Sequence, residues 1–210
     1  MSNKKTIITI GRQFGSGGHE IGATIARDLG IKLYDKEMLK RAAKESGLCE
    51  ELFETHDEKP NYSFLYSLVM EHYSIGSQNG MPINHQLFLE QYDTIKKLAE
   101  EESCVLIGRC ADYALADNPD AIHVFIYADL DARVRRISHM YDMTIAEAKD
   151  IIKKNDKKRA NYYNYYTNKD WGNAKSYDLC IDSSKLGIGG TAKVIEDYVK
   201  LRQKIEKPRI

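Results

Sequence analysis

The stretch that decides the fold reads Gly11-Arg12-Gln13-Phe14-Gly15-Ser16-Gly17-Gly18-His19-Glu20. A β-branched run at residues 6–10 precedes it, and an apolar segment with helical spacing at residues 19–29 follows it. Glycines allow successive backbone N–H groups to converge, and the N-terminus of a helix adds the positive end of its dipole. A strand, a glycine turn and a helix in this order therefore predict a cradle for phosphate.

The turn departs from the usual phosphate-binding pattern, G-x-x-x-x-G-K-[ST]. When Gly17 is aligned with the second glycine, Arg12 stands in place of the first glycine and Gly18 in place of the lysine. The hydroxyl residue is replaced by His19 or, one position later, by Glu20. Both diagnostic side chains are missing, so the interpretation of the turn depends on the rest of the chain.

Length, charge and cysteine usage limit the class of protein. The 210 residues carry 31 Lys plus Arg and 31 Asp plus Glu, and a neutral balance argues against a dedicated nucleic-acid binder, which is usually basic. No apolar run approaches the roughly 18 residues of a membrane span, and residues 6–10 are too short for a signal peptide. The four cysteines form no C-x-x-C pair, which predicts reduced thiols in a cytoplasmic protein.

The remaining segments alternate between short apolar runs and amphipathic stretches, as in a doubly wound α/β sheet. We expect strands at residues 6–10, 31–34, 104–107, 122–127 and 177–181. We expect helices at residues 19–29, 36–44, 62–73, 85–102, 131–141 and 191–204, and a further helix from the capping box at 144–147 to about residue 158. Residues 160–177 are polar and tyrosine-rich, and no element is assigned to them.

Chemistry-bearing residues follow three of the predicted strands. The glycine turn follows the first strand, Asp35 ends the second, and Gly108-Arg109 ends the third. In a parallel α/β sheet, ligands bind at the carboxyl ends of the strands. Asp35 is also suited to capping a helix, and Arg109 to a surface salt bridge, so both alternatives remain open.

A basic region lies on the predicted helices after the fourth strand. Arg133 and Arg136 are three residues apart and share a helix face, and a second basic run extends from residue 153 to Arg159. The guanidinium group presents a fixed fork of donors that suits phosphate. We interpret these three arginines as phosphate ligands and the neighbouring lysines as a solvated helix face.

Together these segments resemble the cytidylate kinase-like family, a branch of the P-loop nucleoside monophosphate kinases. The matching segments are residues 8–21, 34–37 with Arg41, 105–113, 129–136, 156–163 and 177–186. The resemblance implies a P-loop NTPase three-layer α/β fold with a central parallel sheet. It further implies a single domain, residues 1–210, whose core comprises residues 5–35, 103–137 and 174–204, with a helical acceptor-binding lobe at 36–100 and a helical lid at 138–172.

The activity that the resemblance implies is ATP-dependent phosphoryl transfer to a nucleoside monophosphate, with CMP or dCMP first in line. Asp35 would bind the sugar or base side of the acceptor, and Arg41 and Arg109 its phosphate. The family's D-G-R-D corresponds to residues 107–110, so its arginine matches Arg109, while Asp112 lies two residues beyond the missing second aspartate. Arg133, Arg136 and Arg159 would be the lid arginines that close over the transferred phosphoryl group.

The resemblance also distributes roles within the glycine turn. The ATP phosphates would lie on residues Gly15, Ser16, Gly17, Gly18, His19 and Glu20. Without the lysine, another cation must neutralise the β- and γ-phosphates, and Arg12 is the first candidate. Without the hydroxyl residue, Glu20 or Ser16 would hold Mg²⁺, directly or through water.

Three other classes compete with this interpretation. A dinucleotide-binding redox domain would use Asp35 on a ribose, but G-x-G-x-x-G fails because Glu20 occupies its third glycine. A nucleotide-binding regulator without catalysis would explain the missing lysine, and a kinase of another small acceptor would explain the lost aspartates. The aromatic-rich segment 62–73 is either a homodimer face or part of the core.

Overall fold

The computed structural model describes residues 5–35 and 83–205. Within these ranges, five parallel strands form one sheet in the order β2-β3-β1-β4-β5. The strands are β1 Ile7–Arg12, β2 Lys32–Tyr34, β3 Cys104–Ile107, β4 Ala121–Tyr127 and β5 Leu179–Asp182. The helices are α1 Gly18–Leu29, α5 Ile83–Glu101, α6 Ala111–Ala114, α7 Leu130–Tyr141, α8 Ile145–Thr167 and α9 Ser183–Lys204, with a 3₁₀ turn at Ala174–Ser176.

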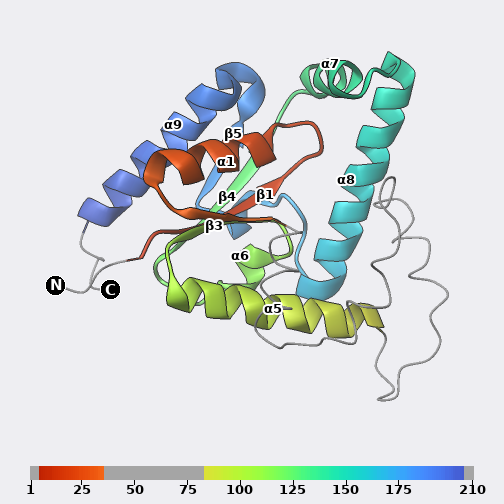
Figure 1. Ribbon diagram of the computed structural model, residues 1–210. Helices are drawn as coiled ribbons and strands as arrows, with labels where there is room; N and C mark the ends of the chain where they lie inside the picture. Colours follow the sequence, from red (N-terminus) through yellow and green to blue (C-terminus); the bar gives the residue numbers. More distant parts are fainter. Residues whose placement is uncertain (1–4, 36–82, 206–210) are drawn as a thin grey trace.

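The core lies on both faces of the sheet, which gives three layers (Figure 1). Helices α1 and α9 cover one face, where Ile8 and Ile10 of β1 pack with Ile25 and Ile195. Helices α5 and α6 cover the other face, to which Ile7 of β1 contributes. Because both faces are covered, the strands are apolar along their whole length, as is typical of parallel sheets. The three-layer fold with a central parallel sheet is confirmed.

The strand order determines which residues meet at the carboxyl edge of the sheet. Strand β1 is central, and Ile10 is in register with Ile107 of β3 and Val124 of β4. The glycine turn after β1 therefore lies between the ends of β3 and β4. From β1 the chain crosses to β2 and β3 on one side of the sheet, and later to β4 and β5 on the other side. The point where the strand order reverses is the usual position of a ligand site in such sheets.

Helices α7 and α8 form a separate packing unit at one side of the sheet (Figure 1). Val134 and Ile137 of α7 pack against Ile152 of α8, and Phe14 of the glycine turn packs against the same cluster. The predicted capping box is confirmed, because Thr144 accepts a hydrogen bond from the backbone of Glu147, whose side chain accepts one from Thr144 in return.

Two helices extend well beyond their expected bounds. Helix α8 continues to Thr167, so its predicted end near residue 158 is wrong. The tyrosine run extends the helix because Tyr166 stacks on Phe88 of α5, with ring centroids 4.2 Å apart. Helix α9 begins at Ser183 rather than residue 191, and a non-helical Gly187, at φ 65°, separates its first turn from the remainder.

Other expectations fall outside the described residues. These are the helices at 36–44 and 62–73, Arg41, and most of the acceptor-binding lobe, so the division into core, lobe and lid stays a prediction. Among the helices of residues 5–35 and 83–205, none combines the length and apolarity needed to cross a membrane.

Candidate functional site

The glycine turn has the backbone conformation of an anion cradle. Gly15 and Gly17 have φ values of 80° and 77°, which glycine adopts without the penalty that a Cβ imposes. Gly17 is the N-cap of α1, and no side chain caps the first turn of this helix. The N-terminal N–H groups of α1 and the positive end of its dipole are thus available to an anion over the turn.

Residues far along the chain hold the turn in place. Asp156 of α8 accepts a hydrogen bond from the Phe14 N–H at 2.7 Å. Ser183 donates its hydroxyl to the carbonyl of Ser16 at 2.7 Å. Sequence reasoning missed both residues, because nothing in the local pattern around either one points to the turn.

Arg133 is part of this support. It is buried, and its Nε donates to the carbonyl of Ala128 at 3.1 Å. Its Nη1 donates to Asp156 Oδ2 at 2.5 Å and to the carbonyl of Phe14 at 3.3 Å. The side chain that was expected to close over a phosphoryl group is therefore engaged with protein oxygens and joins α7, α8 and the glycine turn.

Three other arginines gather on the β3 side of the turn: Arg12, Arg109 and Arg159. Burial, followed by the charges of Arg159 and Arg109, lowers the pKa of Arg12 well below its ordinary value, and Asp35 opposes this shift. Burial and the charge of Arg109 likewise lower the pKa of Arg159 to about 10, against the pull of Asp156. Cations that destabilise one another in this way form a site that an anion would stabilise.

Two of the three arginines, Arg159 and Arg109, are positioned by contacts of their own. Arg159 donates Nη1 to the carbonyl of Arg12 at 2.8 Å and lies over the Phe14 ring. Arg109 follows Gly108 in a left-handed turn, with φ values of 57° and 70°, and its guanidinium carbon lies 5.9 Å from the ring centre of Tyr162. The structure thus brings together Arg12, Arg109 and Arg159 from β1, the β3 end and α8.

A second set of charged groups lies at the start of α1. Arg136 forms an ion pair with Glu20, close to Gly17. His19 Nε2 and Asp35 Oδ2 are 3.1 Å apart. These contacts place one predicted lid arginine beside the cradle and link the predicted acceptor residue Asp35 to the loop.

The predicted Mg²⁺ residues differ in their surroundings. The Ser16 hydroxyl is buried and donates to the carbonyl of Gln13 at 2.9 Å, whereas the Glu20 side chain is 50% exposed. No group of three or more metal-ligating side chains occurs in residues 5–35 and 83–205. Of the two residues, Glu20 is the one that would hold an Mg²⁺ ion whose other ligands are mainly phosphate oxygens.

Asp112, predicted to bind the acceptor, lies inside the protein. It is buried and accepts a hydrogen bond from the Tyr163 hydroxyl at 2.6 Å. Burial raises the pKa of Asp112, while the hydrogen bond from Tyr163 and the charge of His123 oppose the shift. The contact connects α6, the short helix after β3, to α8, one turn beyond Arg159.

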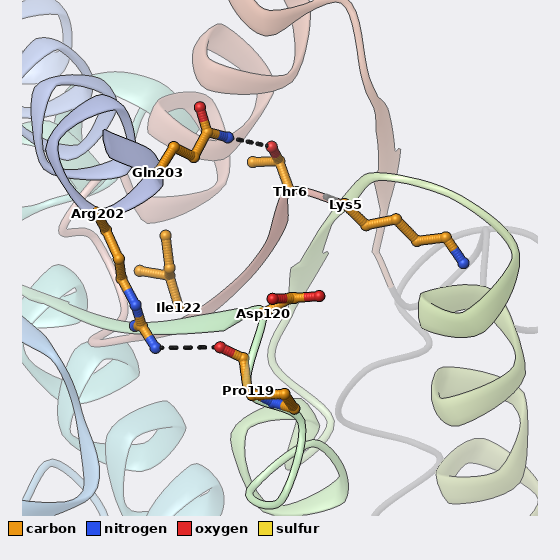
Figure 2. A pocket seen from close by; sticks show the side chains of 7 residues that line it. All are labelled: Lys5, Thr6, Pro119, Asp120, Ile122, Arg202 and Gln203. Carbon is orange, nitrogen blue, oxygen red and sulfur yellow. Dashed lines mark hydrogen bonds between the residues drawn. The ribbon is translucent and has the colours of Figure 1, made fainter. Parts of the chain in front are cut away.

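Two hollows flank the sheet. A cavity of about 120 Å³ opens beside the glycine turn on the β4–β5 side, and its lining residues are Gly15, Ser16, Ala128, Ala132, Arg136, Ser183, Ser184, Gly187 and Ile188. The other hollow lies at the opposite end of the strands, where Arg202 donates to the Pro119 carbonyl and Gln203 to Thr6 (Figure 2). That small hollow lies between the end of α9 and the sheet, and its lining includes Lys5, Asp120 and Arg202.

Comparisons with known proteins agree with this geometry. The sequence profile described as "Cytidylate kinase-like family" matches residues 7–185. A protein named cytidylate kinase from Methanothrix thermoacetophila is 24% identical over 190 residues, which cover 90% of this chain and 94% of that protein. An uncharacterized protein from Eubacterium ventriosum has a crystal structure that is 30% identical, with a TM-score of 0.70 over 93% of this chain and 99% of that one.

More distant structures share the fold. Shikimate kinase from Bacteroides thetaiotaomicron is 16% identical, with a TM-score of 0.52 over 93% of this chain and 98% of that one. Shikimate kinase from Acinetobacter baumannii, in complex with shikimate, is 13% identical, with a TM-score of 0.53 over 97% of each chain. The glycine turn, the strand order and the match over residues 7–185 lead to one conclusion: the chain belongs to the cytidylate kinase-like family.

Proposed function

We propose that this protein transfers the γ-phosphoryl group of ATP to a nucleoside monophosphate, with CMP or dCMP as the first candidates. The observation that carries the proposal is the convergence of Arg12, Arg109 and Arg159 beside the glycine turn. An acceptor that already bears a phosphate would neutralise Arg109 and Arg159 better than a neutral acceptor, while Arg12 meets the phosphates of the donor. Membership of the cytidylate kinase-like family supports the same substrate class.

The reaction assigns a separate task to each side of the turn. The triphosphate lies over the cradle, and an oxygen of the acceptor phosphate attacks the γ-phosphorus while the bond to the bridging oxygen of ADP breaks. Such transfers depend on positioning and on neutralisation of charge more than on covalent help. Arg109 and Arg159 hold the acceptor phosphate. Arg136 releases Glu20 and pairs with the donor phosphates instead. Mg²⁺ bound to the triphosphate would supply further neutralisation, and Glu20 would hold it, directly or through water.

Helices α7 and α8 have a mechanical part in this proposal. They carry Arg136 and Arg159, and their shared core includes Phe14 of the glycine turn. Movement of this unit would therefore shift the positions of Arg136, Arg159 and the glycine turn together. Closure over the two nucleotides would exclude water and favour transfer over hydrolysis of ATP.

The test is an ADP-release assay with ATP and Mg²⁺ across CMP, dCMP, UMP, AMP, GMP and shikimate. We expect CMP or dCMP to raise ADP release above the ATP-only background. Arg109→Met should raise the KM for the acceptor, while Arg135→Met, an exposed arginine of α7, should leave it unchanged. If no nucleotide raises turnover, the proposal is wrong, and intact ATP binding would then favour the regulator.

A second candidate is a kinase of a hydroxyl-bearing acceptor. The close approach of His19 and Asp35 favours it, because an imidazole or carboxylate beside the cradle can take the proton of an attacking hydroxyl. The shikimate arm of the assay represents this class. Turnover with shikimate and none with the nucleotides would replace the first proposal by the second.

A further inference from the structure

The side chain of Arg12 takes an unusual course between two glycines. At Gly18, the first residue of α1, an added Cβ would lie 2.6 Å from the Cβ of Arg12 and 2.9 Å from its Cγ. Gly18 has no left-handed φ value, so its backbone does not require glycine. The stem of Arg12 accounts for the missing side chain at this position.

The head of the same side chain rests on the second glycine. At Gly108, an added Cβ would overlap with Nη1 of Arg12 and would lie 3.2 Å from its Cζ. Arg12 thus leaves the end of β1, passes the N-terminus of α1 and ends at the turn after β3. Because Gly18 and Gly108 lack side chains, they leave the space that the stem and the guanidinium of Arg12 occupy.

This course explains why the phosphate-binding pattern lacks its lysine. A lysine at position 18 would begin in the space that Arg12 fills, so the two residues exclude each other. We infer that Arg12 supplies the positive charge of the cradle in place of a lysine at position 18, and that Gly18 is glycine because Arg12 lies over it. Gly108, whose φ of 70° by itself favours glycine, leaves room for the guanidinium. The inference deepens the proposed function by assigning the cation that meets the phosphates of the donor.

An exchange of the two positions tests the inference directly. Arg12→Gly combined with Gly18→Lys restores the G-x-x-x-x-G-K pattern across residues 12–18. We expect Arg12→Gly alone to lose affinity for pyrophosphate and ADP by about tenfold or more in isothermal titration calorimetry. The double variant should regain most of this loss, whereas Gly18→Lys in the presence of Arg12 should bind pyrophosphate more weakly than the wild type.

A neutral substitution separates space from charge. Gly18→Ala adds one methyl group and should weaken pyrophosphate binding in the presence of Arg12, but should change little in the Arg12→Gly background. The matched control is Gly189→Ala, because a Cβ at Gly189 meets nothing within 4 Å. Circular dichroism melts of every variant establish that the protein is folded, and the Arg12→Gly background keeps the test valid if Gly18→Ala alone does not fold.

The inference is overturned if Gly18→Ala binds pyrophosphate as the wild type does, if Arg12→Gly retains full affinity, or if Gly18→Lys fails to improve Arg12→Gly. These measurements require no acceptor. A negative kinase assay with the expected binding pattern would remove the proposed function and leave the role of Arg12 intact. Kinase activity of the wild type together with unchanged pyrophosphate binding in Arg12→Gly would support the proposed function and remove the role of Arg12.

Discussion

Replacement of Asp156 by alanine should loosen the glycine turn and destabilise the whole protein. The carboxylate accepts the Phe14 N–H through Oδ1 at 2.7 Å and faces Nη1 of Arg133 through Oδ2 at 2.5 Å. Asp156→Ala therefore removes one backbone partner of the turn. It also leaves the Arg133 guanidinium buried without a counter-charge.

The magnitude follows from the burial of the pair. Removing one partner of a buried ion pair costs about 3–5 kcal/mol. The Arg133 side chain is 9% exposed and Asp156 is 19% exposed, and Arg133 keeps its hydrogen bonds to the carbonyls of Ala128 and Phe14. We therefore expect the lower end, a loss of about 3 kcal/mol, which lowers Tm by about 6–12 °C for a chain of this length.

Urea unfolding, thermal melts and pyrophosphate titration measure the effect. The matched control is Asp150→Ala, an exposed carboxylate on the same helix, which should change the free energy of unfolding by about 0.5 kcal/mol or less. Asp156→Asn keeps an acceptor for the Phe14 N–H, so its free energy of unfolding should lie between those of Asp156→Ala and Asp150→Ala. Equal stability of Asp156→Ala and Asp150→Ala would refute the idea that this pair braces the turn.

Three further changes test other parts of the structure. Tyr163→Phe leaves the buried Asp112 carboxylate without its hydroxyl partner and should lower the free energy of unfolding by about 1–3 kcal/mol in urea, while Tyr165→Phe, whose tyrosine is 77% exposed, should be neutral. Burial raises the pKa of Asp112 above its ordinary value of about 4. The contribution of Asp112 to the free energy of unfolding is therefore complete below pH about 4 and is lost as pH rises through the raised pKa. Asp112→Asn should flatten this part of the profile in melts across pH, and an unchanged slope would assign the pH dependence to another group. Thr144→Ala removes the capping box of α8 and should cost about 1 kcal/mol in urea, so an unchanged midpoint would show that the cap adds nothing measurable.

The strands could be predicted from the sequence because their information is local. Fully apolar runs such as residues 104–107 are typical of strands in a parallel sheet covered on both faces, and all five expected strands are present. The end of α8 could not be predicted in this way. Tyr162 and Tyr166 are helical because they pack with Phe88, which lies more than seventy positions earlier in the chain, and such tertiary contacts override local preference.

The candidate site shows the same division. The glycine turn, Asp35 and Arg109 follow strands, so their shared edge could be inferred from the parallel arrangement of the strands. Helical spacing predicted that Arg133 and Arg136 share a face, but it could not reveal that Arg133 is buried against Asp156 and Phe14. Gly18 was interpreted as a missing lysine, whereas its environment is the stem of Arg12. The assigned roles of these residues in binding and catalysis stay predictions.

The distant supports of the glycine turn impose an order in time. Phe14 is held by Asp156, 142 positions later, and Ser16 by Ser183, 167 positions later. At about 5–20 residues per second on the ribosome, the first of these partners is added about 7–28 s after the turn itself. The cradle is therefore synthesised before the residues that brace it, and a growing chain carries no fully braced phosphate site until Ser183, the first residue of α9, has emerged.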